Sequence, residues 1–323
     1  MLTIAIDAMG CDHGPSVVVD GALQASEVYP DVNLVLVGQE DAIRYELAKH
    51  KNNPRISILH APEVITPDEV PTSAIRQKKG SSLVVGLKAV KEGQASGFVS
   101  AGSTGALLTG ATVIVGRKKG IERPALGTPI PTKTGFTLLI DCGANMDCKA
   151  SYLMQFGQIG AEYMQKALGV ENPKVGLINV GVEEGKGNAA AKEAYTLLAE
   201  SELNFVGNVE AREIPSGVID VAVCDGFVGN IVLKFMEGLS KSMLSIIKEE
   251  LMASKLSKLG ALLAKGAFGN VKKRFDYREV GGAPFLGLKS LVVKAHGSSD
   301  AFAMKNAIIK CIIFEKEDVK DGI

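Results

Sequence analysis

Acidic, amide and hydroxyl side chains follow several short apolar runs in this sequence, each time close to a glycine. In the first of these places, Ile4 and Ile6 belong to a run that predicts a buried strand, which ends at Asp7 and leads through small residues to His13. A strand that stops on an acid, followed by a turn and a helix start, is typical of the βα corners where open α/β sheets bind ligands. The alternative is that Asp7 caps the turn and His13 is an ordinary loop residue.

The same arrangement recurs after further predicted strands at 97–100, 138–141, 174–180, 218–223 and 290–294. The polar residues that follow them are Ser103, Thr104, Asn145, Lys186, Asn188, Asp225, Asn230, His296, Ser298, Ser299 and Asp300. Because the carboxyl ends of parallel strands meet at one edge of a sheet, the recurrence predicts a cleft lined by several βα loops. Taken singly, each residue also fits a structural role; Ser103, for example, is a favourable helix N-cap.

Two of these segments invite a more specific interpretation. The loop 179–188 matches the loose dinucleotide pattern at Gly185–Ala190, but Glu183 and Glu184 are badly placed beside a pyrophosphate, and the spacing of a P-loop is also missed. We therefore reject both fingerprints and keep Lys186 as a candidate phosphate or oxyanion ligand. His296 beside two serines and Asp300 suits anion binding or proton transfer; residues this close in sequence rarely form a Ser-His-Asp triad.

The composition narrows the class of protein. The 323 residues are enough for one large or two ordinary domains, and 46% of them are apolar. Lys+Arg and Asp+Glu are equal at 36 each, which argues against nucleic acid as a partner. The five cysteines include no Cys-x-x-Cys pair and the four histidines lack metal-ligand spacing, so we expect neither disulfides nor zinc. We see no signal peptide and no apolar run of the ~20 residues that a membrane span needs, and we expect a cytoplasmic location.

The segment 240–275 has a different character. Apolar residues recur at helical spacing and lysines punctuate them. The apolar stripe, which ends in Leu256, Leu259, Leu262 and Leu263, predicts a core or dimer face. The basic polar side also suits a helix that lies on an anionic bilayer. A second basic run, with Arg76, Lys78 and Lys79, is either a solvated face or a site for an anionic partner.

Taken together, these motifs carry a resemblance to a family. DAMGCDHGP, SAGSTGAL, DCGAN, NVG-EE-GKGN, NVEAR, DGF-GN, GGA-FLG and K-AHGSSD occur in the order expected of bacterial phosphate acyltransferases of phospholipid synthesis. The resemblance spans Ile4 to Asp300. Four positions depart from the usual pattern, because Cys11 replaces a glycine, Gly14 an alanine, Ser103 an asparagine and Val280 a tyrosine.

The resemblance implies a Rossmann-like, three-layer α/β/α sandwich, similar to phosphotransacetylases and isocitrate-type dehydrogenases. It implies one catalytic domain over 1–323 with a protruding amphipathic helical segment at 240–275. It also implies a homodimer with peripheral membrane attachment, and a membrane glycerol-phosphate acyltransferase as a further partner. The reaction it implies transfers a fatty acyl group from acyl-acyl-carrier-protein to inorganic phosphate, with no metal or nucleotide cofactor.

The resemblance leaves the residue roles as hypotheses. Lys186 would stabilise phosphate or the oxyanion, supported by Asn188. His13 and His296 would contact phosphate or protonate the departing thiolate. The remaining candidates would orient these groups, donate hydrogen bonds or hold phosphate: Asp7, Asp225, Asp300, Asn145, Asn230, Ser103, Thr104, Ser298 and Ser299. The acidic carrier protein would dock on Arg76, Lys78 and Lys79 or on 255–273.

Three alternatives stay open at this point. A phosphotransacetylase that uses acyl-coenzyme A would share the chemistry without the carrier protein. A nicotinamide dehydrogenase is disfavoured because no convincing dinucleotide loop is present. A membrane scaffold without catalysis would not need polar residues after so many strands.

Overall fold

A computed structural model describes residues 2–316 of the chain. Its strands are β1 (Thr3–Asp7), β2 (Asn33–Gly38), β3 (Ile56–His60), β4 (Gly97–Ser100), β5 (Ala125–Pro131), β6 (Phe136–Ile140), β7 (Lys174–Asn179), β8 (Asn204–Glu210), β9 (Val221–Val223), β10 (Gly282–Leu286) and β11 (Leu291–Ala295). They form one sheet, whose order is β3-β2-β1-β4-β11-β10-β5-β6-β9-β7-β8.

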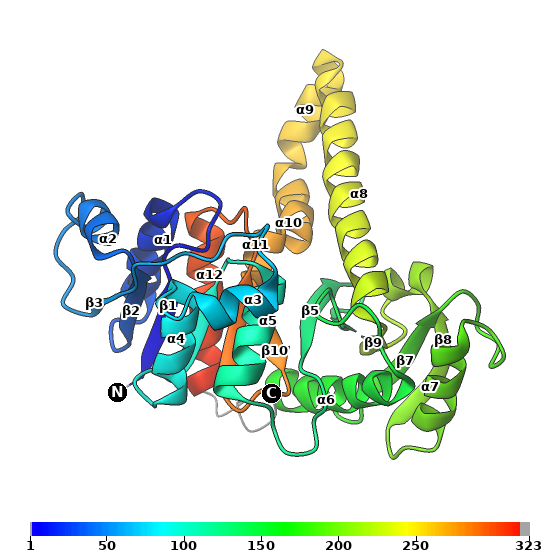
Figure 1. Ribbon diagram of the computed structural model, residues 1–323. Helices are drawn as coiled ribbons and strands as arrows, with labels where there is room; N and C mark the ends of the chain where they lie inside the picture. The colour runs from blue at the N-terminus through cyan, green and yellow to red at the C-terminus, as the bar shows by residue number, and fades with distance from the viewer. Residues whose placement is uncertain (1, 317–323) are drawn as a thin grey trace.

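Helices cover both faces of this sheet (Figure 1). They are α1 (Pro15–Val28), α2 (Glu40–Leu47), α3 (Pro71–Gln77), α4 (Ser82–Lys91), α5 (Thr104–Gly110), the π-turn η1 (Ala111–Val115), α6 (Ala150–Leu168), α7 (Ala189–Ala199), the 3₁₀ turn η2 (Ala211–Ser216), α8 (Gly226–Met252), α9 (Lys255–Leu263), α10 (Lys265–Phe275), α11 (Tyr277–Val280) and α12 (Ala301–Lys316). One apolar core lies between the sheet and α1, α6, α7 and α12, and a second lies against α3, α4, α5 and the start of α8. The architecture is therefore the expected three-layer α/β/α sandwich.

The two middle strands, β5 and β10, were not predicted from the sequence. Antiparallel pairing of β10 with both β11 and β5 joins the parallel group around β1 to the parallel group around β9. Both strands contain proline, which is unusual in a central strand, and neither shows a clear alternation of apolar and polar residues. Their places in the sheet depend on contacts with distant strands, which no local pattern encodes.

The protruding segment is a helical hairpin. The amphipathic segment was expected at 240–275, but the helix α8 already begins at Gly226 and runs unbroken to Met252, and α9 and α10 return beside it. Figure 1 shows the hairpin (yellow and orange) standing clear of the sandwich. No residue of α9 or α10 is buried, because these helices pack mainly on each other and on α8. At the base of the hairpin, Arg274 of α10 also donates to the carbonyl oxygens of Thr132 and Lys133. Within residues 2–316, no helix is both long and apolar enough to cross a bilayer.

Candidate active site

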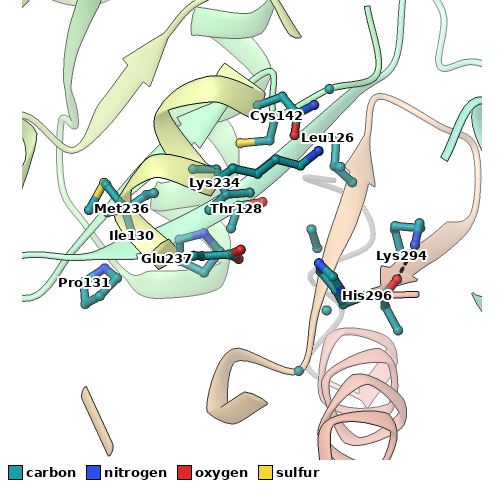
Figure 2. A pocket seen from close by; sticks show the side chains of 18 of the residues that line it. Leu126, Thr128, Ile130, Pro131, Cys142, Lys234, Met236, Glu237, Lys294 and His296 are labelled. Atoms are coloured by element: carbon teal, nitrogen blue, oxygen red, sulfur yellow. Dashed lines mark hydrogen bonds between the residues drawn. The ribbon is translucent and has the colours of Figure 1, made fainter. Parts of the chain in front are cut away.

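A cavity of about 410 Å³ opens between β5, the first half of α8, and the end of β11. Its size lies in the range of small-molecule sites. Six of its polar lining residues are Thr104, Asn230, Lys234, Glu237, Lys294 and His296. Figure 2 shows Lys234 and Glu237 extending from α8 in the direction of β11, which carries Lys294 and is followed by His296. Side chains of α8 and of the end of β11, which are distant in the chain, therefore face one another across this space.

The opposite part of the cavity wall is apolar. Along β5, Leu126 and the consecutive residues 128–131 line the cavity. A strand rises about 3.3 Å per residue, so the stretch from Leu126 to Ile130 is about 13 Å long. Leu233 and Met236 of α8 face the same space, and Figure 2 shows Met236, Ile130 and Pro131 together at the end away from His296. The cavity thus combines apolar surface along β5 and α8 with a polar end around Lys294 and His296, and Glu237 lies beside the apolar surface.

His296 lies at the polar end, directly after β11. Its Nδ1 is 2.8 Å from the Ser298 hydroxyl and 3.2 Å from the Ser298 backbone nitrogen, which donates to it. Ser299, which is buried, donates its hydroxyl to the His296 carbonyl oxygen at 2.7 Å and so fixes the turn. Partial desolvation lowers the pKa of His296 below its ordinary value, and the nearby Lys294 lowers it further. The imidazole is consequently neutral at pH 7.

Lys294 is the residue that the sequence analysis missed. It points from β11 to the cavity side of the sheet, and its ammonium donates to the backbone carbonyl oxygens of Ala101, at 3.2 Å, and of Ala295. Burial lowers its pKa to about 8. The available signal was a lysine inside an otherwise apolar strand, since lysine is rarely buried without a partner.

The first βα corner packs beside the His296 turn. The backbone nitrogen of Asp12 donates to the Gly297 carbonyl oxygen at 2.9 Å. Asp7 is buried, and its carboxylate accepts from the Ser100 hydroxyl at 2.7 Å and from the Met9 backbone nitrogen at 3.1 Å. Asp7 therefore ties the ends of β1 and β4 together, whereas His13 is exposed in this corner and does not line the cavity.

A second corner positions Asn230. Asp225 caps α8 by accepting from the Val228 backbone nitrogen at 2.7 Å, and the Gly226 nitrogen donates to the Asn145 carbonyl oxygen at 2.7 Å. Asn145 donates its amide to Asp141 at 2.9 Å. Asn230 follows about one turn into the helix and faces the cavity, so Asp225 and Asn145 act through the placement of α8.

Asp141 is a second residue to which the sequence analysis gave no role. The side chain is buried and also accepts from the Leu126 backbone nitrogen at 3.0 Å, which links β6 to the cavity wall. Burial raises the pKa of Asp141. Together with Asn145, it joins β5, β6 and α8 at the cavity.

Several other predicted site residues are helix caps. Ser103, Asn188 and Asp300 each accept a hydrogen bond from the backbone nitrogen three residues later, at 3.4, 2.9 and 2.8 Å. Ser, Asn and Asp are the preferred cap residues, so a polar residue before an apolar helix carries this signal whether or not a ligand binds nearby. Of these cap positions, only the one at Ser103 leads directly to a cavity residue, Thr104.

Lys186 lies on an exposed loop and is not among the residues that line the cavity. Its ammonium is 3.9 Å from the Glu183 carboxylate, and its carbonyl oxygen accepts from the Asn179 amide at 3.1 Å. Thr104, Asn230 and His296 are the predicted residues that the structure brings to the cavity, and the roles given to Lys186 and Asn188 stay predictions.

Comparison with known proteins supports a family assignment. A model of the family described as "Fatty acid synthesis protein" matches residues 2–321. A phosphate acyltransferase from Clostridium perfringens strain SM101 is 51% identical over 320 residues, which cover 98% of this chain and 94% of that protein. The chain belongs to the phosphate acyltransferase family.

Solved structures extend the likeness to the fold. A phosphotransacetylase from Streptococcus pyogenes superposes with a TM-score of 0.61 at 19% identity, over 97% of this chain and 94% of that one. A 4-hydroxythreonine-4-phosphate dehydrogenase from Klebsiella pneumoniae gives a TM-score of 0.57 at 12% identity, over 98% and 100%. The predicted fold class of this phosphate acyltransferase family member is thereby confirmed.

Proposed function

We propose that the protein transfers a fatty acyl group from acyl-acyl-carrier-protein to inorganic phosphate and releases acyl phosphate. The observation that supports this proposal is a cavity with both polar and apolar surface, in a chain of the phosphate acyltransferase family. A phosphate ion needs cations and hydrogen-bond donors, and the cavity offers both in Lys234 and Thr104. A fatty acyl chain needs apolar surface, which Leu126, Ile130 and Met236 supply.

The proposed chemistry is a direct displacement. A phosphate oxygen attacks the thioester carbonyl carbon, the carbon–sulfur bond breaks, and the carrier thiolate leaves and takes up a proton. Phosphate is already an anionic nucleophile, so the enzyme gains most by holding it against the thioester and stabilising the oxyanion. Because Asn230 and His296 line the cavity, we assign to Asn230 a hydrogen bond to that oxyanion. We assign to His296 the transfer of a proton from the attacking hydrogen phosphate to the departing sulfur.

The remaining predicted residues take roles of position in this proposal. Asp7, Asp225, Asn145, Ser298, Ser299 and Asp300 hold the corners that carry Thr104, Asn230 and His296. Lys186 and His13 lie on exposed segments beside these corners, and we propose that they contact phosphate or carrier only when substrate is bound. Residues 1–323 would act as one catalytic domain.

We propose that the hairpin forms the dimer interface and attaches the protein to the membrane. Phe235, Leu239, Met243 and Ile246 of α8 are exposed, and a second copy of this chain would cover them in a homodimer. Leu256 and Leu263 of α9 are more than 80% exposed near the tip, and lysines flank them. This end would touch the membrane reversibly and bring the acyl phosphate close to a membrane glycerol-phosphate acyltransferase.

The carrier protein is the proposed acyl donor, in preference to coenzyme A. The basic residues that could receive an acidic carrier are Arg76 on α3 and Lys78 and Lys79 directly after it. Lys78 pairs with Glu69 at 2.8 Å and is therefore less available than the other two. An acyl-coenzyme A donor, as in a phosphotransacetylase, is the second candidate function, favoured only by the shared fold.

Purified protein tests the proposal directly. Supplied with a fatty acyl-carrier-protein and orthophosphate, it should release acyl phosphate, which hydroxylamine traps as a hydroxamate. The same acyl group on coenzyme A should react at least about tenfold more slowly, a difference of about 1.4 kcal/mol in the barrier. Absence of acyl phosphate with both donors contradicts the proposed function, and equal rates would favour the coenzyme A alternative.

A further inference from the structure

The ammonium of Lys294 is a buried positive charge without a counterion. No carboxylate lies within 4.0 Å of it in the part of the chain that the structure describes. Two neutral carbonyl oxygens, of Ala101 and Ala295, accept two of its three N–H donors. Burying a charge is costly unless it is paired, so the site is electrostatically incomplete as it stands.

The two nearest acids do not complete it. Asp7 stabilises the charged form of Lys294 from a distance, but its carboxylate oxygens accept hydrogen bonds from Ser100 and Met9. Asp12 also acts only from beyond ion-pair distance and is exposed to solvent. The side of Lys294 that faces open space is the cavity, next to Thr104 and His296.

We propose that Lys294 binds the inorganic phosphate that attacks the thioester. The inference rests on the proposed function and adds to it the residue that holds the nucleophile. Phosphate bound there would supply the missing counterion and accept the third N–H of the ammonium. The Thr104 hydroxyl is a cavity donor that can help to complete the shell around the ion. A lysine serves here as a compact point charge, which suits a small tetrahedral anion.

Lys310 provides a matched control. It is also a lysine whose ammonium is buried, with a pKa of about 8, and it donates to the Gly282 carbonyl oxygen at 2.9 Å. It belongs to α12 and is not among the cavity residues. Lys294→Met and Lys310→Met each remove one buried ammonium while keeping a long side chain. Only Lys294→Met should weaken the binding of phosphate.

The experiment is steady-state kinetics with phosphate varied at saturating acyl-carrier-protein, then with the donor varied at saturating phosphate. Lys294→Met should raise the KM for phosphate about 10- to 100-fold, the usual loss for a hydrogen bond to a charged group. The KM for the acyl donor should stay within about twofold. Lys310→Met should leave both KM values near those of the wild-type protein.

The outcomes separate the alternatives. A fall in kcat with an unchanged KM for phosphate would place Lys294 on the thioester oxyanion and overturn the proposal, as would equal effects of both variants. If the wild-type protein forms no acyl phosphate, the proposed function fails. Calorimetric titration of wild type and Lys294→Met with phosphate alone then still decides whether Lys294 binds the ion.

A measurement on the wild-type protein covers the case in which Lys294→Met does not fold. The affinity for the phosphate dianion, calculated from the dianion concentration at each pH, should fall as pH rises through about 8, where Lys294 loses its proton. The titratable groups around it are Asp7, Cys11, Asp12 and His296; the pKa of Cys11 is raised above 9.0 and that of His296 lowered below 6.5, so neither crosses this window. A dianion affinity that stays constant from pH 7 to 9 contradicts the proposal.

Discussion

At the scale of single residues, two buried lysines lower the stability of the folded chain, because each ammonium is removed from water. Lys310 and Lys294 both have a pKa near 8, against an ordinary 10.5, because burial disfavours the ammonium. The difference corresponds to a cost of about 3 kcal/mol for keeping the charged form in the folded chain. Proteins tolerate such costs mainly where a group has a function, which we assign to Lys294 and not to Lys310.

Lys310→Met should therefore stabilise the protein. The folded-state pKa is lowered, so the cost is fully present below about pH 8, where folded and unfolded chains both hold the proton. Between about pH 8 and 10.5 the folded chain has released the proton and the unfolded chain has not, so wild-type stability from this group rises with pH. Denaturant unfolding at pH 7 should show a gain of up to about 3 kcal/mol, reduced by the lost hydrogen bond to Gly282.

The pH dependence provides the check on that prediction. The difference in unfolding free energy between the variant and the wild-type protein should shrink from pH 8 towards pH 10. A difference that is constant over this range would mean that the folded chain holds the Lys310 proton as long as the unfolded chain does, so that burial does not lower its pKa. Other groups that titrate there act equally on both proteins and cancel in the difference.

At the scale of elements, the helical hairpin exposes apolar side chains that no other part of the fold covers in residues 2–316. In α9, Leu259 and Leu262 are 55% and 66% exposed, and nothing else in residues 2–316 covers them. Its base is firmly tied, since Arg278 pairs with Asp276 at 2.6 Å and with Asp300 at 3.0 Å. An element that is anchored at the base and apolar at the tip is suited to reach a surface beyond the sandwich.

Leu259→Glu and Leu262→Glu should weaken membrane binding. Each variant replaces apolar area that the bilayer would bury by a negative charge, which an anionic lipid surface repels. Flotation with vesicles that contain an acidic phospholipid should recover several-fold less of either variant than of the wild-type protein. Asn270→Glu, which adds the same charge to the exposed surface of α10, serves as the control and should float nearly as well. Unchanged flotation of the leucine variants would count against a membrane role for α9.

At the scale of the whole molecule, the exposed apolar row on α8 argues for a second copy of the chain. Phe235 is 66% exposed and Met243 53%, although a monomer gains nothing by presenting them to water. They lie nearer the sandwich than the α9 leucines do, so dimer and membrane contacts can coexist on one hairpin.

The wild-type protein should sediment as a dimer, and Met243→Glu should shift it towards the monomer at micromolar concentration, because a charge buried in an apolar interface costs several kcal/mol. Ser245→Glu puts the same charge on another side of α8 and should leave the dimer intact. A wild-type protein that sediments as a monomer, or a Met243→Glu variant that stays dimeric, would contradict this use of the face.

The family resemblance implied the three-layer fold, whereas the local pattern of the sequence by itself indicated an open α/β sheet and the residues at the ends of its parallel strands. Those features are local, since periodicity, glycine turns and cap residues act over a few positions. It also placed Thr104, Asn230 and His296 as site residues, and all three line the cavity. It could not tell them apart from Ser103, Asn188 and Asp300, because one residue chemistry serves both caps and ligands.

Only the tertiary structure decided which loops share a cavity. That choice depends on β5 and β10, whose pairing is set by strands distant in the chain. The same pairing brings Lys294 of β11 opposite α8 and leaves its ammonium buried without a counterion. The surroundings of a charge are a property of packing between remote segments. The pattern within β11 could indicate a buried lysine, but it could not show which groups surround the ammonium.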